Sequence, residues 1–197
     1  MKLREHQVML RSDRVVLRPM TEGDWAIVAK WETDPEIIHW ADTGIVTSRT
    51  VAEVRQIFRV VSQRALCFIV ELDGKPIGDG WLQEMNLEKL LKAYPGLDCR
   101  RIDLVIGEKD LWGRGLGVDI IRTLARFAFE QEKADMVFGI TGDYNEQSQG
   151  AFMKAGFSLV MKLEEPPPGR AKLSYVFAVV RSAFNTSGKT GKGLKEE

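Results

Sequence analysis

The chain has 197 residues, 44% of them hydrophobic and 28% charged, and its 28 basic side chains balance 28 acidic ones. This length and composition are typical of one globular domain with a full core, and the balanced charge provides no positive field that would gather nucleic acid or an anionic membrane. Because no apolar run approaches the roughly 18 residues of a membrane span, and the first ten residues lack a signal-peptide core, we expect a cytoplasmic protein that acts on a small molecule.

The N-terminal region is expected to begin with a strand and a helix. Residues 15–19 form a short β-branched run closed by a proline, which is typical of an edge or first strand. Thr21, followed three residues later by Asp24, resembles a capping box. The apolar stripe after it predicts a helix that stops at the Asp-Pro pair 34–35. The short apolar piece 37–40 fits no single element type.

A helix and a β-hairpin are expected next. Apolar residues recur at helical spacing over 50–65. An Asp-Gly pair at 73–74, between the β-rich runs 66–72 and 75–83, is the best-supported hairpin signal in the chain. The mixed segment 85–98 follows, and it is either a substrate-binding loop or a solvated connector.

The two cysteines indicate neither a disulfide framework nor a metal site. Cys67 lies in an apolar strand-like run, and Cys99 lies in a segment whose composition indicates a loop. Only His6 and His39 accompany them, which makes no zinc set. We therefore expect two free thiols and no metal.

The stretch around three glycines is the most informative part of the sequence. Residues 101–106 form a β-rich apolar run, which predicts a strand, and Gly113, Gly115 and Gly117 follow a short polar loop. From Leu116 onward apolar residues recur at helical spacing, so a helix should begin within the glycine turn. Its N-terminus would present unpaired N–H donors and the positive end of the helix dipole, which together bind a phosphate or pyrophosphate group.

Three phosphate-binding families use this arrangement, and the spacing of the glycines separates them. A Rossmann fingerprint needs a glycine where Val118 stands, and a P-loop needs a Lys-Ser/Thr pair where this turn has only Arg114 as a cation. The segment from Trp112 to Gly117 resembles the coenzyme A pyrophosphate loop of GNAT acetyltransferases, with Trp112 in place of the usual Arg or Gln. The alternative for the loop alone is a glycine-rich turn that binds no ligand.

The C-terminal third predicts three strands and a helix. Residues 136–141 are expected to form a strand, and 145–154 a helix that Gly156 ends as a C-terminal cap. The runs 157–162 and 172–181 are expected to be two further strands, joined by a proline-rich loop.

The element order resembles that of the GNAT acyltransferase fold. Residues 185–197 carry one apolar side chain and predict a flexible C-terminal tail, which leaves 1–184 as a single domain. The predicted order β α α β β β α β α β β implies an α/β fold with a mixed central sheet of six to seven strands flanked by helices. The resemblance covers nearly the whole chain and rests on the segments 17–24, 73–78, 101–103, 112–117, Asn145 and 154–157.

Within this superfamily the chain resembles the aminoglycoside 6′-N-acetyltransferases, which carry an Arg-x-Ile-Asp segment the same distance before the glycine loop. The resemblance implies an antibiotic-resistance type of enzyme that transfers acetyl from acetyl-coenzyme A, as co-substrate, to a primary amine. It would act as a monomer or a homodimer. Two alternatives stay open: a protein N-terminal acetyltransferase similar to those that act on ribosomal proteins, and a non-catalytic module that binds acyl-coenzyme A.

Asp103 is the candidate catalytic residue. Acyl transfer to an amine needs a group that takes the proton of the ammonium ion. An acidic side chain in an apolar strand is unusual, and the aspartate at this place is the proposed base in the resembling enzymes. The alternative is a structural ion pair with Arg100 or Arg101.

The resemblance also implies which residues hold the cofactor. Backbone N–H groups of the strand that carries Asp103 would polarise the thioester carbonyl. Asn145 would bond the pantetheine arm, unless it is only a helix cap. Phe152 stands where the family has a tyrosine acid, so either water protonates the thiolate or it leaves unprotonated. The full set is Leu104, Val105, Ile106, Trp112, Gly113, Arg114, Gly115, Leu116, Gly117, Val118, Asn145 and Phe152.

The acceptor side of the site is predicted from charge. Aminoglycosides carry several positive charges, so a groove lined with acids would hold this polycationic amine. The candidate residues are Trp40, Asp42, Asp79, Glu84, Glu88 and Asp98. Ile140 stands where the resembling enzymes have an acid, which departs from their pattern.

Overall fold

One mixed sheet organises the chain in the computed structural model, which describes residues 2–42, 46–165 and 169–187. The strand order is β1-β2-β3-β4-β5-β6-β8-β7. The strands are β1 (Leu10–Arg11), β2 (Val15–Pro19), β3 (Ala65–Leu72), β4 (Lys75–Glu84), β5 (Cys99–Ile106), β6 (Met136–Gly142), β7 (Ser158–Glu164) and β8 (Leu173–Val180). The predicted α/β class is confirmed, but the sheet has eight strands rather than six or seven, because the short β1 pairs with β2.

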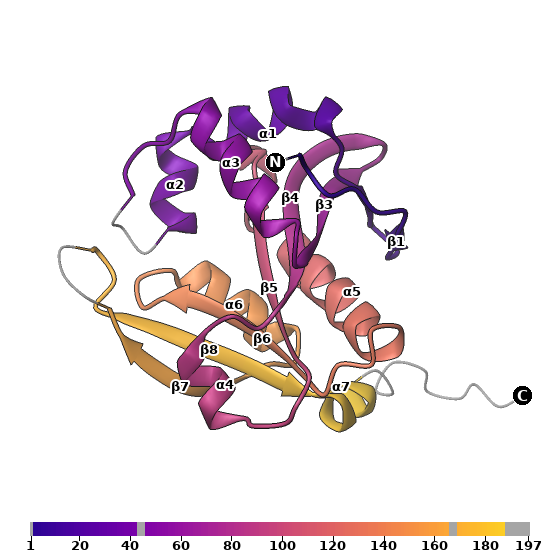
Figure 1. Cartoon of the computed structure of the whole chain (residues 1–197), viewed down its shortest axis with the longest axis vertical. Helices are drawn as coiled ribbons and strands as arrows, with labels where there is room; N and C mark the ends of the chain where they lie inside the picture. The colour runs from indigo at the N-terminus through magenta and orange to yellow at the C-terminus, as the bar shows by residue number, and fades with distance from the viewer. Residues whose placement is uncertain (1, 43–45, 166–168, 188–197) are drawn as a thin grey trace, which may run out of the picture.

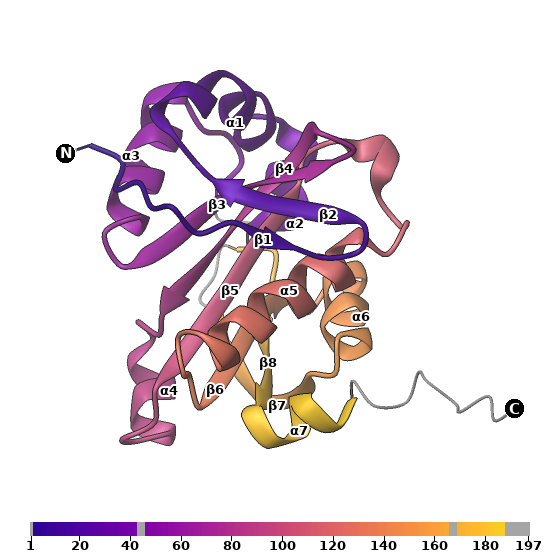
Figure 2. The ribbon, with the colours of Figure 1, turned by 90° about the vertical axis from the view of Figure 1, so that its right-hand side faces the viewer.

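Helices cover both faces of the sheet. They are α1 (Trp25–Glu32), α2 (Pro35–Ala41), α3 (Val51–Val61), α4 (Glu88–Ala93), α5 (Leu116–Glu130), α6 (Glu146–Lys154) and α7 (Arg181–Ser187), with short 3-10 helices at Glu22–Asp24 and Lys109–Leu111. In Figures 1 and 2, α1, α2 and α3 gather at the end of the molecule opposite α4 and α7.

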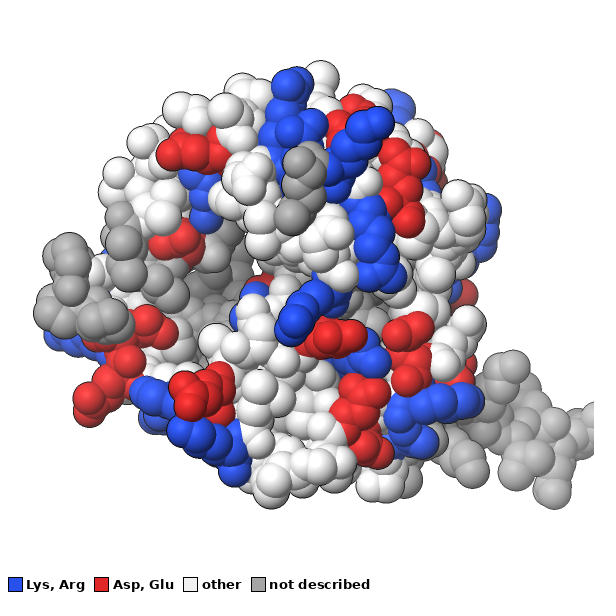
Figure 3. All heavy atoms as spheres, in the orientation of Figure 1, with Lys and Arg blue, Asp and Glu red and all other residues white. Residues whose placement is uncertain are grey.

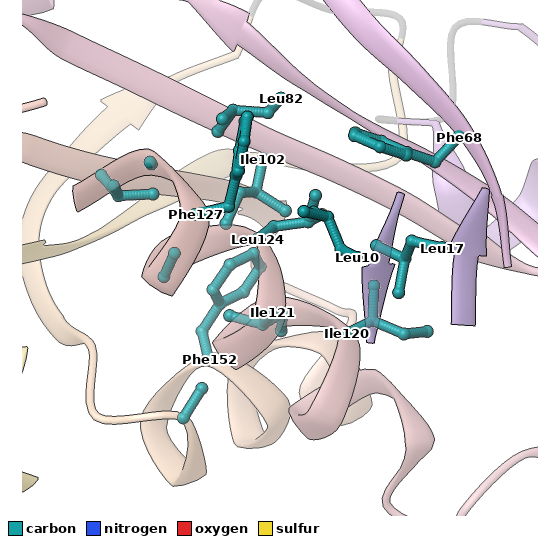
Figure 4. Packing of buried hydrophobic residues seen from close by; sticks show 14 of the residues in the cluster. Leu10, Leu17, Phe68, Leu82, Ile102, Ile120, Ile121, Leu124, Phe127 and Phe152 are labelled. Atoms are coloured by element: carbon teal, nitrogen blue, oxygen red, sulfur yellow. The ribbon is translucent and has the colours of Figure 1, made fainter. Parts of the chain in front are cut away.

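The largest hydrophobic core lies between the sheet and α5. Apolar residues of α5 pack on the sheet together with Phe152 of α6, as Figure 4 shows. A second core joins α1 and α3 to the opposite face of β3, and a third packs Leu90 of α4 against β5, β6 and β8. Burial on both faces explains why β3 and β6 read as continuous apolar runs rather than as an alternating pattern.

One local expectation is wrong, that Cys99 lies in a loop, and the structure adds detail at two other places. The Asp34-Pro35 pair does not only end α1; it starts α2, because the Asp34 Oδ1 accepts hydrogen bonds from the N–H groups of Glu36 (2.9 Å) and Ile37 (3.4 Å), and proline fits the first helical turn. Cys99 opens β5 instead of lying in a loop. Helix α7 includes residues 185–187 of the predicted tail; residues 188–197 lie outside the described part.

Strands β5 and β6 pair for only part of their length. Their parallel register runs from Cys99 opposite Met136 to Ile102 opposite Gly139, whereas β5 stays paired with β4 as far as Ile106. Beyond Ile102 the two parallel strands therefore diverge. This opening in the middle of the sheet positions the site described below.

No helix in the described ranges is long and apolar enough to cross a membrane. Within the same ranges, no group of three or more His, Cys, Asp or Glu side chains is placed to hold a metal ion.

Candidate active site

A cavity of about 590 Å³ opens where β5 and β6 diverge. Its lining comes from segments far apart in the sequence: α1, α2, α3, the segment before α3, β4, β5, the glycine turn, α5, β6 and α6. Figure 3 shows this face of the molecule hollowed between the part that carries α2 and the part that carries α6. The cavity thus crosses from the glycine turn at one end to the helices of the N-terminal region at the other.

The end of β5 turns backbone donors toward the opening. Gly107 donates its N–H to the Ile77 carbonyl at 2.8 Å, which fixes the alternation of the antiparallel pairing with β4. By that alternation the N–H of Val105 also faces β4, whereas those of Leu104 and Ile106 face the gap left by β6. Three N–H groups were predicted to polarise the thioester carbonyl. The strand register leaves two of them, those of Leu104 and Ile106, unpaired with β4 and directed toward the cavity.

Trp112 closes the end of the same strand. Its indole Nε1 donates to the Ile106 carbonyl at 2.7 Å, and the ring lines the cavity. The N–H donor of tryptophan thus serves the backbone here, which accounts for an aromatic residue where the resembling loops have Arg or Gln.

The glycine turn needs glycine at two positions. Gly113 and Gly115 have φ of 75° and 78°, in the left-handed region that side chains disfavour. Helix α5 starts at Leu116, and the N–H groups from Gly113 to Gly117 donate to no acceptor in the described part of the chain. The predicted bare helix N-terminus is therefore present, and all its glycines line the cavity.

Two arginines flank the glycine turn, and only one of them was predicted. Arg114 does not line the cavity; its carbonyl accepts a hydrogen bond from Arg14 Nη2 at 3.0 Å. Arg14 also pairs with Asp119 of α5 at 3.1 Å. Arg14 lies a hundred residues earlier in the chain, so nothing in the local sequence could have linked it to the turn.

Asp103 lines the cavity on β5, beside the diverging strands. Its Oδ2 accepts a hydrogen bond from Arg101 Nε at 2.7 Å. Arg100, the other arginine considered as a partner, instead pairs with Asp98 at 2.8 Å. From the sequence, Asp103 was either a catalytic residue in the site or a partner in a structural ion pair. In the structure it both lines the cavity and pairs with Arg101.

Glu32 and Arg49 also line the cavity, and sequence reasoning missed both. Arg49 donates to Glu32 at 2.8 Å and to Asp42 at 3.1 Å, which joins α1 to the end of α2. Burial raises the pKa of Glu32, while the Arg49 charge opposes the rise. Neither residue carries a motif; their meeting depends on how α1 packs beside the segment before α3.

Asp79 is fully buried under this cluster and does not line the cavity. Its two oxygens have no hydrogen-bond partner among the described residues. Burial raises its pKa well above the usual range, the nearby Glu32 adds to the rise, and Arg49 opposes it. A neutral buried carboxyl cannot attract a cationic substrate as an acidic wall would, so its predicted role in substrate binding does not fit its position.

Trp40 and Asn145 meet over the cavity. The Asn145 side chain caps α6 by accepting from Ser148 N at 3.0 Å, and its Nδ2 donates to the Trp40 carbonyl at 2.7 Å. Tyr144 adds a bond from its hydroxyl to the His39 carbonyl at 3.1 Å. The end of α2 is thereby tied to the loop before α6. Asn145 is a helix cap and also a cavity residue.

Phe152 lines the cavity but is mostly enclosed. Its ring stacks on Phe177 with centroids 6.0 Å apart, and a Cβ placed on Gly139 would lie 2.0 Å from it. The ring fills space that Gly139 leaves open, which is a packing role. Leu116, Gly117 and Val118 line the cavity around it as expected.

None of the five acids predicted for the acceptor side lines the cavity: Asp42 pairs with Arg49 and Asp79 is buried, as described above. Glu84 is exposed at the end of β4, Glu88 pairs with Lys92 at 2.6 Å, and Asp98 pairs with Arg100. The segment 85–98 that carries two of them packs through Leu90 into the third core and does not line the cavity either. Asn86 of this segment accepts a hydrogen bond from Arg101 Nη1 at 3.2 Å, so the segment contacts the partner of Asp103 without lining the cavity.

The cavity brings three chemical elements together. The helix N-terminus at the glycine turn can hold an anionic group, the N–H groups of Leu104 and Ile106 can polarise a carbonyl, and the Asp103 carboxylate can take a proton. These are the requirements of acyl transfer from a phosphate-bearing donor to an amine.

Comparisons with known proteins agree with this chemistry. The family profile "Acetyltransferase (GNAT) domain" matches residues 14–158. Aminoglycoside N(6′)-acetyltransferase type 1 from Klebsiella pneumoniae and from Serratia marcescens are both 28% identical to this chain over 160 residues, covering 74% of this chain and 75% of theirs.

Solved structures share the fold. AAC(6′)-Ib in complex with ribostamycin and coenzyme A aligns with a TM-score of 0.76 and 24% identity, covering 92% of this chain and 100% of that one. Spermidine N-acetyltransferase from Vibrio cholerae, in complex with coenzyme A and spermine, aligns with a TM-score of 0.72 and 15% identity, covering 88% of this chain and 99% of that one.

Proposed function

The chain belongs to the GNAT acetyltransferase family and acetylates an amine with acetyl-coenzyme A; we propose that the amine is the 6′-amine of an aminoglycoside. The observation that carries the proposal is the position of Asp103, which faces the same cavity as the glycine turn. The curated relatives that match most of the chain act on aminoglycosides, as their names state.

The glycine turn fits the cofactor. The N–H groups from Gly113 to Gly117 have no acceptor in the described chain and lie at the N-terminus of a 15-residue helix, where a pyrophosphate is stabilised. Arg14 lies beside the turn, where Asp119 of α5 partly offsets its charge. When bound, acetyl-coenzyme A supplies an activated thioester.

The residues of β5 then act on the two reacting groups. The N–H groups of Leu104 and Ile106 polarise the carbonyl of the acetyl group. Asp103 holds the ammonium ion and takes its proton, a contribution of roughly 10²–10⁴-fold in rate. Phe152 carries no proton to donate, so the departing thiolate is protonated by water or leaves as the anion.

A panel of amines tests the substrate. We expect coenzyme A thiol release with acetyl-coenzyme A and kanamycin or ribostamycin to exceed release with spermine or with the amino group of an alanyl peptide. Mass spectrometry of the acetylated product, compared with a kanamycin derivative that lacks the 6′-amine, identifies the site of transfer.

Two results would overturn this assignment. Faster turnover of the alanyl peptide would favour a protein N-terminal acetyltransferase. Acetylation of the kanamycin derivative without the 6′-amine, at the rate of kanamycin itself, would place the reaction at another nitrogen.

A further inference from the structure

Arg101 lies outside the cavity and donates a hydrogen bond to the proposed base, Asp103. We propose that Arg101 is a positioning residue that offsets the charge of Asp103, so that the acceptor amine binds without being locked in its ammonium form. The inference rests on the proposed function in one respect, namely that Asp103 receives the amine.

The geometry places Arg101 outside the cavity and Asp103 inside it. Arg101 Nε lies 2.7 Å from Asp103 Oδ2, and Arg101 is absent from the cavity lining. Its Nη1 donates to Asn86 Oδ1 at 3.2 Å, an oxygen that also accepts from Gln83 Nε2 at 3.1 Å. The guanidinium is thus held by a second hydrogen bond and cannot follow substrate into the cavity without breaking it.

The register of the sheet builds this polar row. Gln83 stands opposite Arg101, and Trp81 stands opposite Asp103, on β4 and β5. Side chains at alternate positions of a strand share a face, so Arg101 and Asp103 point the same way. Within the described residues only Oδ2 of Asp103 accepts a hydrogen bond, which leaves Oδ1 for the amine.

The charge of Arg101 changes what Asp103 does to an amine. A lone carboxylate beside an ammonium ion stabilises the charged form and so delays proton loss, by about 1–3 pH units in typical sites. A guanidinium at hydrogen-bond distance from the same carboxylate opposes this effect. The other charged side chains that line the cavity are Glu32 with its partner Arg49, and Glu146 and Lys154 on α6.

Stability alone does not account for the pair. The Arg101 and Asp103 side chains are 17% and 29% exposed, so water screens their attraction. An ion pair that water partly screens adds little to folding stability. A role in catalysis is the larger expected effect of the arrangement.

The neighbouring arginine provides a matched control. Arg100 is as exposed as Arg101 and pairs with Asp98 at 2.8 Å and Glu132 at 3.7 Å. It is one residue away, so its side chain lies on the other face of the strand. Arg100→Gln therefore removes the same charge and a similar pair without touching the row that holds Asp103.

The experiment is a pH–rate profile of Arg101→Gln, Arg101→Lys and Arg100→Gln, from about pH 6 to 10. Acetyl-coenzyme A is saturating and kanamycin is the acceptor, or spermine where wild-type enzyme acetylates spermine faster. For Arg101→Gln we expect the acidic limb of kcat to move up by about one pH unit, with about tenfold slower turnover at pH 7, a lower KM for the amine, and recovery at high pH. Arg101→Lys keeps the positive charge, so the acidic limb of its kcat profile should stay at the wild-type pH. The acidic limb of Arg100→Gln should also stay there.

The outcomes separate the inference from the proposed function. If folded Arg101→Gln keeps the wild-type limb while Asp103→Asn lowers the rate, the role of Arg101 is overturned and the base stands. If the whole profile of Arg101→Gln falls in proportion to a lowered melting temperature, the role is structural. If Asp103→Asn turns over normally, the proposed base itself is wrong.

Discussion

The two ends of the cavity are built in different ways. The end proposed for the cofactor centres on one continuous stretch, β5 through α5, whose expected donors are backbone N–H groups, and Asn145 and Phe152 join it from the region of α6. The acceptor end is built from side chains on α1, α2, β4, β5 and the segment before α3. A backbone site tolerates changes of side chain, such as Trp112, whereas a side-chain site depends on which segments pack together.

The two ends of the cavity also differ in their electrostatics. At the cofactor end the helix N-terminus has donors without acceptors in the described chain. At the acceptor end each carboxylate that lines the cavity beside the sheet already has an arginine: Glu32 with Arg49 at 2.8 Å, and Asp103 with Arg101 at 2.7 Å. We therefore expect one end to attract an anion, and the other to hold a cation with carboxylates whose charge an arginine offsets.

Gly115→Asp should break the cofactor end completely. The new carboxylate would oppose the pyrophosphate at the helix N-terminus, and we expect calorimetry to detect no binding of acetyl-coenzyme A. The added Cβ meets only Arg14 Nη1 at 3.7 Å, but the positive φ of 78° strains any side chain by about 1–2 kcal/mol, so folding of the variant is verified by its melting curve. Gly96→Asp is the control, because Gly96 has nearly the same φ, 77°, open space around it and no place in the cavity. Unchanged affinity in folded Gly115→Asp would remove the glycine turn from the cofactor site.

Asp103→Asn should damage the acceptor end and spare the other. Asparagine keeps the shape and loses the proton acceptor, so kcat should fall by roughly 10²-fold with the affinity for acetyl-coenzyme A intact. The defect should shrink as pH rises, because more amine arrives neutral. Asp98→Asn, which loses a similar arginine pair outside the cavity, should keep its rate. A stable Asp103→Asn enzyme with normal turnover at neutral pH would contradict the mechanism.

Asp79→Asn should reveal the buried charge cluster through the pH dependence of stability. Burial raises the pKa of Asp79 in the folded state above its unfolded value, so folding takes up a proton and stability falls as pH rises between the two values. As pH rises above the unfolded pKa toward the raised folded pKa, wild type should lose free energy of unfolding relative to the variant, by up to about 1.4 kcal/mol per pH unit.

Melting curves at several pH values measure this difference. The buried amide of the Asp79→Asn variant does not titrate, so its own effect on stability is the same at every pH. Asp73→Asn, at an exposed hairpin position, should follow wild type at every pH. Parallel curves for wild type and Asp79→Asn would mean that Asp79 is ionised in the folded protein.

Phe152→Tyr should have the smallest effect on rate. The ring lies against Gly139, so a hydroxyl there overpacks the core at a cost of about 1–3 kcal/mol in stability. Turnover per folded molecule should change little, because the thiolate does not depend on a side-chain acid. A clear gain in kcat, measured by thiol release and corrected for the folded fraction, would show that the cofactor end benefits from a side-chain acid after all.

Much of the fold follows from local sequence. The Asp73-Gly74 hairpin is confirmed because both residues adopt positive φ, 50° and 73°, which this dipeptide favours. The glycine turn and the start of α5 are likewise properties of adjacent residues. Residues 37–40 fitted no single element type because one signal serves two purposes there: the Asp-Pro pair that ends α1 also begins α2.

The sequence by itself determined the family, the glycine turn and the strand that carries Asp103, because backbone conformation and hydrophobic periodicity are read over a few neighbouring residues. Tertiary structure alone decided which acids face the cavity and that Arg49 meets Glu32. Those outcomes depend on how helices and strands pack, which no local pattern encodes. The choice of Arg101 over Arg100 as the partner of Asp103 is local by contrast, because alternate residues of one strand share a face.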